Sequence, residues 1–168
     1  MFNFVLEVVN YMNYVYNQNK NKNISEDPGI NIKIIICDDE NVITNSVKRL
    51  IETFCSEQNR EVFVATCFNG VEVINRIVED SNRNICYSLL LIDEELPYLW
   101  GSDVIKILKK MQKNKELYTF PIYSVTAHDN EDFINELLRI GADGIIKKPM
   151  NKKSLSSILT KLKLLSPK

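Results

Sequence analysis

From Ile32 onward, short apolar runs that suit buried strands alternate with longer segments whose apolar residues recur at helical spacing. The runs are rich in β-branched residues and nearly free of charge, as expected for strands covered on both faces. Five strands alternating with five helices predict an α/β, doubly wound fold, in which a parallel sheet carries helices on both faces. The predicted strands are Ile32–Cys37, Val62–Thr66, Ser88–Ile92, Phe120–Val125 and Gly144–Lys147, and the helical patterns cover residues 43–54, 71–78, 104–111, 134–138 and 155–165.

The first 31 residues differ in character from this alternating region. Residues 1–16 carry apolar side chains at helical spacing, which predicts an amphipathic helix that docks on the domain, pairs with a second copy or binds a partner. Residues 17–31 are polar and rich in Asn and Lys, and they predict a linker. Residues 32–168 then form the main domain.

Composition and charge exclude several classes of protein. With 45% hydrophobic residues the chain can bury a full core, and its formal net charge of -1 argues against a basic nucleic-acid binder. No run approaches the roughly 18 apolar residues of a membrane span. The four cysteines lack a CxxC spacing and the chain has one histidine, so we expect reduced, mostly buried thiols in a cytoplasmic protein and no zinc site.

Polar side chains follow four of the predicted strands at the point where each strand ends. Asp38 and Asp39 follow the first strand, Asp93 the third, Thr126 the fourth and Lys148 the fifth. Because the carboxyl ends of parallel strands share one edge of the sheet, we expect these side chains to lie close together.

Clustered carboxylates repel one another unless a cation lies between them. Mg²⁺ prefers oxygen ligands and is commonly held by one or two carboxylates and phosphate oxygens, while a lysine and a hydroxyl can bind further phosphate oxygens. The set therefore predicts phosphoryl transfer onto a carboxylate, with Asp93 as the nucleophile and Asp38 and Asp39 as metal ligands. The alternative is that acidic residues after strands simply cap the helices that follow.

In these motifs the chain resembles the response-regulator receiver domains (CheY-like) of two-component phosphorelays. The resemblance runs from near Ile32 to the C-terminus and implies a flavodoxin-like strand order of 2-1-3-4-5. It also implies a cis peptide bond between Lys148 and Pro149. The matching stretches, in the family's order, are IIICDDE (34–40), LLLIDEELPYLWG (89–101), PIYSVTA (121–127) and GADGIIKKP (141–149).

The resemblance implies a role for each site residue. Asp93 is expected to accept a phosphoryl group from a phosphohistidine on a histidine kinase or histidine phosphotransfer protein, forming an aspartyl phosphate. Mg²⁺ is the implied cofactor. Its expected ligands are Asp38, Asp39 and the backbone carbonyl of Glu95, and the residues expected to contact the phosphoryl oxygens are Thr126 and Lys148.

Such a protein is a switch that phosphorylates and dephosphorylates itself rather than a turnover enzyme. We expect its output to be protein–protein contact through the helix at 134–138, the strand at Gly144–Lys147 and the helix at 155–165, without direct nucleic-acid binding. The family usually has Tyr or Phe where this chain has Ile145, which changes the usual structural response but not the chemistry. His128 is expected to be a surface loop residue near the water that hydrolyses an acyl phosphate.

Three alternatives remain open from the sequence. The chain could be the receiver segment of a hybrid histidine kinase, or a pseudo-receiver that binds partners without being phosphorylated. An enzyme on a similar fold, such as an aspartate-nucleophile phosphatase or a nucleotide-binding protein, is the third. A phosphatase would need a second aspartate at the position of Glu95, and neither a P-loop nor GxGxxG follows any predicted strand.

Overall fold

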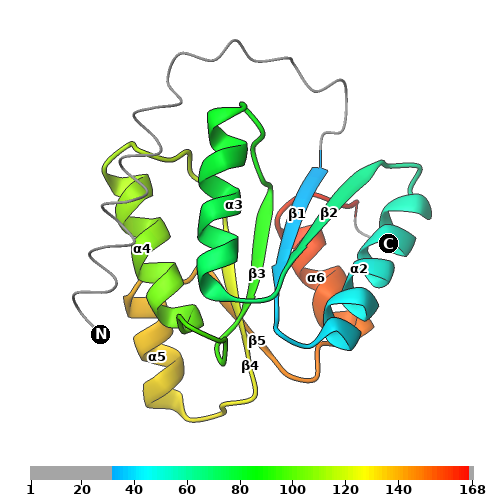
Figure 1. Ribbon diagram of the computed structural model, residues 1–168. Helices are drawn as coiled ribbons and strands as arrows, with labels where there is room; N and C mark the ends of the chain where they lie inside the picture. Colours follow the sequence, from blue (N-terminus) through cyan, green and yellow to red (C-terminus); the bar gives the residue numbers. More distant parts are fainter. Residues whose placement is uncertain (1–31, 167–168) are drawn as a thin grey trace.

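Five parallel strands form one sheet in the order β2-β1-β3-β4-β5, with helices on both faces (Figure 1). The computed structural model describes residues 32–166, so the helix predicted for residues 1–16 and the linker predicted for residues 17–31 lie outside the described residues. The predicted fold and strand order are confirmed. The strands are β1 (Ile32–Cys37), β2 (Val62–Cys67), β3 (Leu89–Asp93), β4 (Ile122–Thr126) and β5 (Gly144–Lys147), and the helices are α2 (Asn41–Ser56), α3 (Gly70–Asn82), α4 (Gly101–Lys113), α5 (Glu131–Arg139) and α6 (Lys152–Lys161).

β1 and β5 have the predicted bounds, and the bounds of β2, β3 and β4 differ from the predicted ones by a residue or two, most clearly at β4. This strand begins at Ile122 rather than Phe120, because Pro121 has no N–H to donate to a neighbouring strand. The Pro121 carbonyl still accepts a hydrogen bond from the N–H of Leu90 at 3.0 Å. β3 extends through Asp93, which is therefore part of the sheet rather than of the loop after it.

Two hydrophobic clusters, one on each face of the sheet, hold the layers together. α3, α4 and α5 cover a cluster that includes Ile35 and Ile92, and α2 and α6 cover one that includes Ile34 and Leu91 (Figure 1). Successive residues of a strand point to opposite faces, so the neighbours Leu91 and Ile92 belong to different clusters. By the same alternation, Asp93 points to the face that α2 and α6 cover.

The last two helices are each followed by a residue with left-handed backbone. α5 ends at Arg139, and Gly141 adopts φ 111°, a backbone conformation that glycine commonly supplies just after a helix. α6 ends at Lys161, and Lys163 adopts φ 58°, so the helix is shorter than the predicted pattern to Leu165. Leu165 is nevertheless buried. Within residues 32–166, no helix has the length and apolar content to cross a membrane.

The order of the strands creates a crevice beside β1. β1 pairs with β2 on one side and with β3 on the other, so that Cys37 lies opposite both Cys67 and Ile92. In open parallel sheets such a reversal of strand order leaves a crevice outside the carboxyl ends of the strands. Asp38 directly follows β1 and Asp93 ends β3, so both lie at this crevice.

Gly101 begins α4 in close contact with the end of β3. A Cβ atom there would overlap the backbone oxygen of Asp93 and lie 3.0 Å from the Cα of Glu94. These are backbone atoms, so β3 itself would have to shift. We expect Gly101→Ala to lower the free energy of unfolding by about 1.5 kcal/mol, measured by urea denaturation. Lys110→Ala, on the exposed side of the same helix, is the control, and equal stability of the two variants would contradict this close packing.

Candidate functional site

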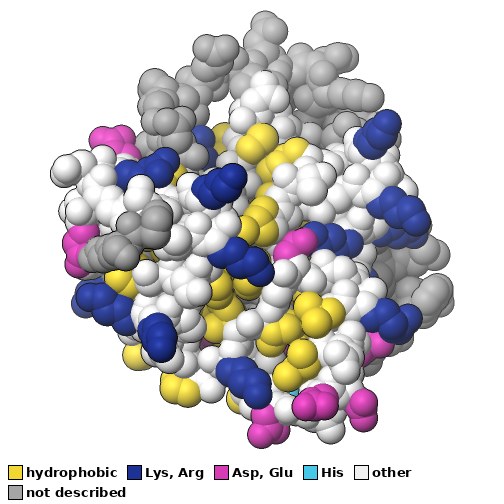
Figure 2. All heavy atoms as spheres, turned by 180° about the vertical axis from the view of Figure 1, so that it is seen from behind, with side chains coloured by type: hydrophobic (Ala, Val, Ile, Leu, Met, Phe, Trp, Pro, Cys, Tyr) yellow, Lys and Arg dark blue, Asp and Glu magenta, His cyan; other side chains and the backbone are white. Residues whose placement is uncertain are grey.

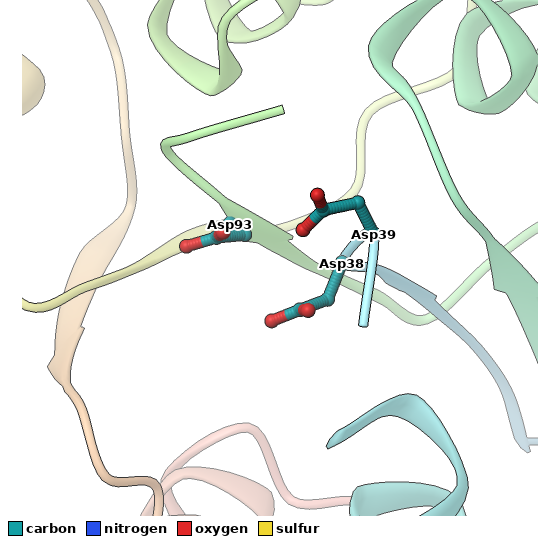
Figure 3. A group of neighbouring side chains, drawn as sticks. All are labelled: Asp38, Asp39 and Asp93. Carbon is teal, nitrogen blue, oxygen red and sulfur yellow. The ribbon is translucent and has the colours of Figure 1, made fainter. Parts of the chain in front are cut away.

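Three aspartates converge at the crevice (Figure 3). Asp38 and Asp39 come from the segment after β1 and Asp93 from the end of β3, and one carboxylate oxygen of each lies within 4.8 Å of the others. Asp38 is 3% exposed and Asp93 is 5% exposed, whereas Asp39 is open to solvent. The structure therefore brings together the three carboxylates that the sequence placed at two strand ends.

Backbone hydrogen bonds hold Asp38 in place. Its N–H donates to the carbonyl oxygen of Cys67 at 3.2 Å, which extends the pairing of β1 with β2 by one residue. Its Oδ1 accepts the N–H of Glu40 at 2.9 Å. The carboxylate orientation is thus set before α2 begins, and Oδ2 is left for a cation.

Lys148 bridges the two buried carboxylates. Its Nζ lies 3.1 Å from Oδ2 of Asp38 and 2.9 Å from Oδ1 of Asp93. The lysine directly follows β5, and its backbone N–H donates to the carbonyl oxygen of Thr126 at 2.8 Å. The peptide bond between Lys148 and Pro149 is cis, as the resemblance implied. The ammonium group therefore lies between residues from the first and third strands.

Burial and neighbouring charges together determine the pKa values of Asp93 and Lys148. Burial raises the pKa of Asp93, and the hydrogen bond and charge of Lys148 only partly offset this effect. Burial by itself would lower the pKa of Lys148, but its bonds to Asp93 and Asp38 outweigh that cost and raise it. The site thus favours a bound positive charge.

The donor set also fits a hard divalent cation. Three carboxylate oxygens lie close enough to share one ion, and oxygen is the ligand that Mg²⁺ prefers. Because burial keeps the Asp93 pKa raised even with Lys148 present, further positive charge would be favourable there. Mg²⁺ therefore fits the carboxylates of Asp38, Asp39 and Asp93.

The other predicted site residues lie at the same edge of the sheet, at the end of β4 and after β3 and β4. Thr126 ends β4 and is 1% exposed, and its hydroxyl accepts a hydrogen bond from the N–H of His128 at 3.1 Å. His128 is an exposed loop residue as expected, and its Nε2 lies 3.4 Å from Oε1 of Glu95. The Glu95 side chain is itself exposed, so this pair lies at the surface of the site.

Helix capping does not explain the acidic residues after β1. The N-cap residue of α2 is Glu40, and its side chain makes no capping hydrogen bond. The Asp38 carboxylate accepts the N–H of Glu40 itself, which precedes the helix, and otherwise binds Lys148. The capping alternative therefore fails at the carboxylate that lies deepest in the site.

Sequence reasoning missed a cavity of about 490 Å³ beside the carboxylates. It lies where the first turns of α2 meet the segment after β5, and its walls are mainly apolar. Val42, an apolar residue at the start of α2, is 77% exposed beside the cavity, but this exposure could not be predicted from the sequence. The residues around the cavity include Asp93 and Lys148 together with Val42, Val47 and Met150.

Comparisons with known proteins agree with this geometry. A family model described as the response regulator receiver domain matches residues 34–160. The chain is 26% identical over 129 residues to the osmosensing histidine protein kinase SLN1 of Saccharomyces cerevisiae, covering 77% of this chain and 10% of that kinase. It is 28% identical over 119 residues to the transcriptional regulatory protein CrdR of Helicobacter pylori, covering 71% of this chain and 49% of that protein. The chain thus spans half or less of these relatives.

Solved structures show the same fold. The receiver domain of the Francisella response regulator 1452 is 26% identical with a TM-score of 0.59, and the match covers 79% of this chain and 96% of that one. A response regulator receiver domain protein of Clostridium thermocellum is 23% identical with a TM-score of 0.64, covering 78% of this chain and 93% of that one.

Proposed function

Because the chain belongs to the response regulator receiver domain family, we propose that it is a phosphorylatable switch of a two-component phosphorelay. Asp93 accepts a phosphoryl group from a histidine kinase or a histidine phosphotransfer protein in a Mg²⁺-dependent step. The observation that carries this proposal is the close approach of three carboxylates and one ammonium group at the crevice of the sheet. The phosphoryl group remains on the protein, so the chain acts as a switch rather than as a turnover enzyme.

The proposed step is an in-line displacement at phosphorus. An oxygen of ionised Asp93 forms a bond to phosphorus while the bond from phosphorus to the imidazole nitrogen of the donor breaks, and the imidazole keeps that electron pair. Lys148, at 2.9 Å from Asp93, can donate to a phosphoryl oxygen. The Thr126 hydroxyl accepts the N–H of His128 and keeps its own proton for a second phosphoryl oxygen.

The metal site has a separate part in the proposal. Asp38, Asp39 and the backbone carbonyl of Glu95 are the proposed ligands. Bound there, Mg²⁺ supplies positive charge to the phosphoryl oxygens. Asp38 is held by its hydrogen bond from Glu40, so this ligand needs little rearrangement.

We place the output surface on α5, β5 and α6. Leu138 is 46% exposed on α5, and Ile145 and Ile158 are half-buried. Seen from behind, hydrophobic side chains form a broken band with Lys and Arg along its sides and Asp and Glu mainly at its lower end (Figure 2). A mixed surface of this kind suits a protein target. Ile145 packs against the cluster under α3, α4 and α5, so this position has no aromatic ring with which to respond to phosphorylation.

We also propose a cellular location and a setting for this receiver domain. A cytoplasmic location agrees with the four free cysteines. The chain functions either alone or as the receiver segment of a hybrid kinase, and relatives of the second kind include the hybrid signal transduction histidine kinase I of Dictyostelium discoideum.

Phosphoryl uptake tests the proposed function directly. Wild-type protein incubated with Mg²⁺ and acetyl phosphate is expected to gain the mass of one phosphoryl group, and EDTA is expected to prevent the gain. Intact-mass spectrometry measures both. No gain with acetyl phosphate or with phosphoramidate would overturn the proposal in favour of a pseudo-receiver. Repeated turnover of a phosphoester by catalytic amounts of protein would instead indicate an enzyme.

Mg²⁺ is expected to stabilise the folded protein because it binds a site that the unfolded chain lacks. At about ten times its dissociation constant it should raise the Tm by roughly 4 °C, measured by calorimetry. Asp38→Asn should lose most of this shift. Asp129→Asn, which alters an exposed carboxylate in the loop after β4, should keep it. An equal shift in both variants would place the metal elsewhere.

A further inference from the structure

Glu94 follows the proposed phosphoacceptor and is a buried carboxyl group without a part in the transfer step. It is 1% exposed, and its Oε2 has no hydrogen-bond partner. The carboxyl accepts hydrogen bonds from the backbone N–H and the hydroxyl of Ser102, in the first turn of α4. Burying a carboxyl group with an unpaired oxygen costs free energy. The bonds to Ser102 suggest which interaction offsets this cost.

α4 depends on Glu94 for its N-terminal cap. The N-cap residue is Trp100, whose side chain makes no capping hydrogen bond, and the first N–H groups of a helix have no partner within it. The backbone oxygen of Glu94 accepts the N–H of Gly101 at 3.0 Å, and its carboxyl accepts the N–H of Ser102. A carboxylate at this end also interacts favourably with the helix dipole. One residue at the end of β3 therefore caps a helix that begins seven positions later.

The same residue is tied to the sheet. The N–H of Glu94 donates to the carbonyl oxygen of Val125 in β4 at 3.2 Å. Gly101 lies so close to Asp93 that a Cβ atom would not fit between them. Hydrogen bonds and close packing therefore hold both ends of the loop of residues 94–100 in place. Glu95, the proposed carbonyl ligand, lies within this loop.

We infer that Glu94 is a positioning residue, which holds the first turn of α4 against the ends of β3 and β4 and so fixes the loop that presents the Glu95 carbonyl to Mg²⁺. The part concerning Mg²⁺ rests on the proposed function. The anchoring of α4 does not, because it follows from the hydrogen bonds of Glu94 alone.

The test compares Glu94→Leu, which replaces the acceptor with an apolar side chain of similar size, with Glu94→Gln, which keeps a carbonyl oxygen. In EDTA, amide hydrogen exchange by NMR reports on residues 102–104. Trp100, the one tryptophan of the chain, reports on the loop and on Mg²⁺ binding by fluorescence. Glu94→Leu should exchange faster at these amides and bind Mg²⁺ about tenfold more weakly, while Glu94→Gln should remain near wild type. Asp103→Asn, which alters the other carboxylate of this turn, is the control.

The two parts of the test separate two kinds of failure. If wild-type protein binds Mg²⁺ and Glu94→Leu binds it equally well with a native circular dichroism spectrum, the inference is wrong. Unchanged amide exchange in Glu94→Leu also overturns it, whether or not Mg²⁺ binds. If wild-type protein fails to bind Mg²⁺, it is the proposed function that fails, and the exchange measurement still decides whether Glu94 anchors α4.

Discussion

Asp93→Asn is expected to reduce phosphoryl uptake from acetyl phosphate by at least about 1,000-fold, because an amide cannot act as the nucleophile. Asparagine keeps the size of the side chain and an oxygen that can accept the hydrogen bond of Lys148. In the absence of metal, the Asp93→Asn variant should be at least as stable as the wild-type protein. Burial raises the pKa of Asp93, so its ionised form is less favoured in the folded chain than in the unfolded one. Time-resolved intact-mass spectrometry measures the uptake.

Asp129→Asn is the matched control for this experiment. It removes an exposed carboxylate close to His128 and should take up the phosphoryl group at the wild-type rate. If Asp93→Asn gained the phosphoryl mass as fast as this control, the acceptor would be another residue. Peptide mapping of the product would then identify it.

Lys148→Met is expected to have the second largest effect, on stability as well as on chemistry. Without the ammonium group, the buried carboxylates of Asp38 and Asp93 lose the cation that pairs them at 3.1 and 2.9 Å. We expect the free energy of unfolding to fall by about 3 kcal/mol in EDTA, near the low end for a broken buried pair, since the lysine side chain is 22% exposed. Phosphoryl uptake should fall by at least about 100-fold.

The difference in free energy of unfolding between wild type and Lys148→Met should depend on pH. The folded-state pKa of Lys148 is raised above its ordinary value of 10.5, so the stabilisation is complete below that value and is lost as the pH rises through the raised pKa. The gap between wild type and Lys148→Met should therefore shrink above pH 10.5 in urea denaturation.

Lys147→Met provides the control for Lys148→Met, because Lys147 is the exposed neighbour at the end of β5. It should keep the stability and phosphoryl uptake of wild type. Mg²⁺ should restore part of the stability of Lys148→Met, since a divalent cation can neutralise the same carboxylates. Equal loss of stability in both lysine variants would show that the pairing with Asp38 and Asp93 contributes nothing specific.

Much of the fold could be predicted from local patterns in the sequence. The β-branched run of Ile32–Cys37 and the helical spacing after it identify their elements without any knowledge of their neighbours. The predicted ends of strands and helices were less accurate where contacts with other elements determine them. β4 starts after Pro121 because the strand beside it requires an N–H, and α6 stops before Lys163 although apolar residues continue to Leu165.

The site divides in the same way. The sequence could predict that these side chains gather at one edge of the sheet, because each lies at or just after a strand end and parallel strands place their carboxyl ends together. They are Asp38, Asp39, Asp93, Thr126 and Lys148. The sequence pattern says nothing of which strands are neighbours, and the order that brings β1 beside β3 came from the resemblance to receiver domains. The bridge from Lys148 to both carboxylates depends on that order.

Other features of the site had no signal in the sequence. Glu94 looked like one more acidic residue after a strand, yet it is buried and caps a helix through Ser102. The sequence by itself determined the elements, the face on which each side chain lies and the chemical groups at the strand ends, because these follow from periodicities along the backbone. Only the tertiary structure decided which carboxylates share a cation, which one caps α4 and where an apolar cavity opens, because those outcomes depend on distances between residues far apart in the chain.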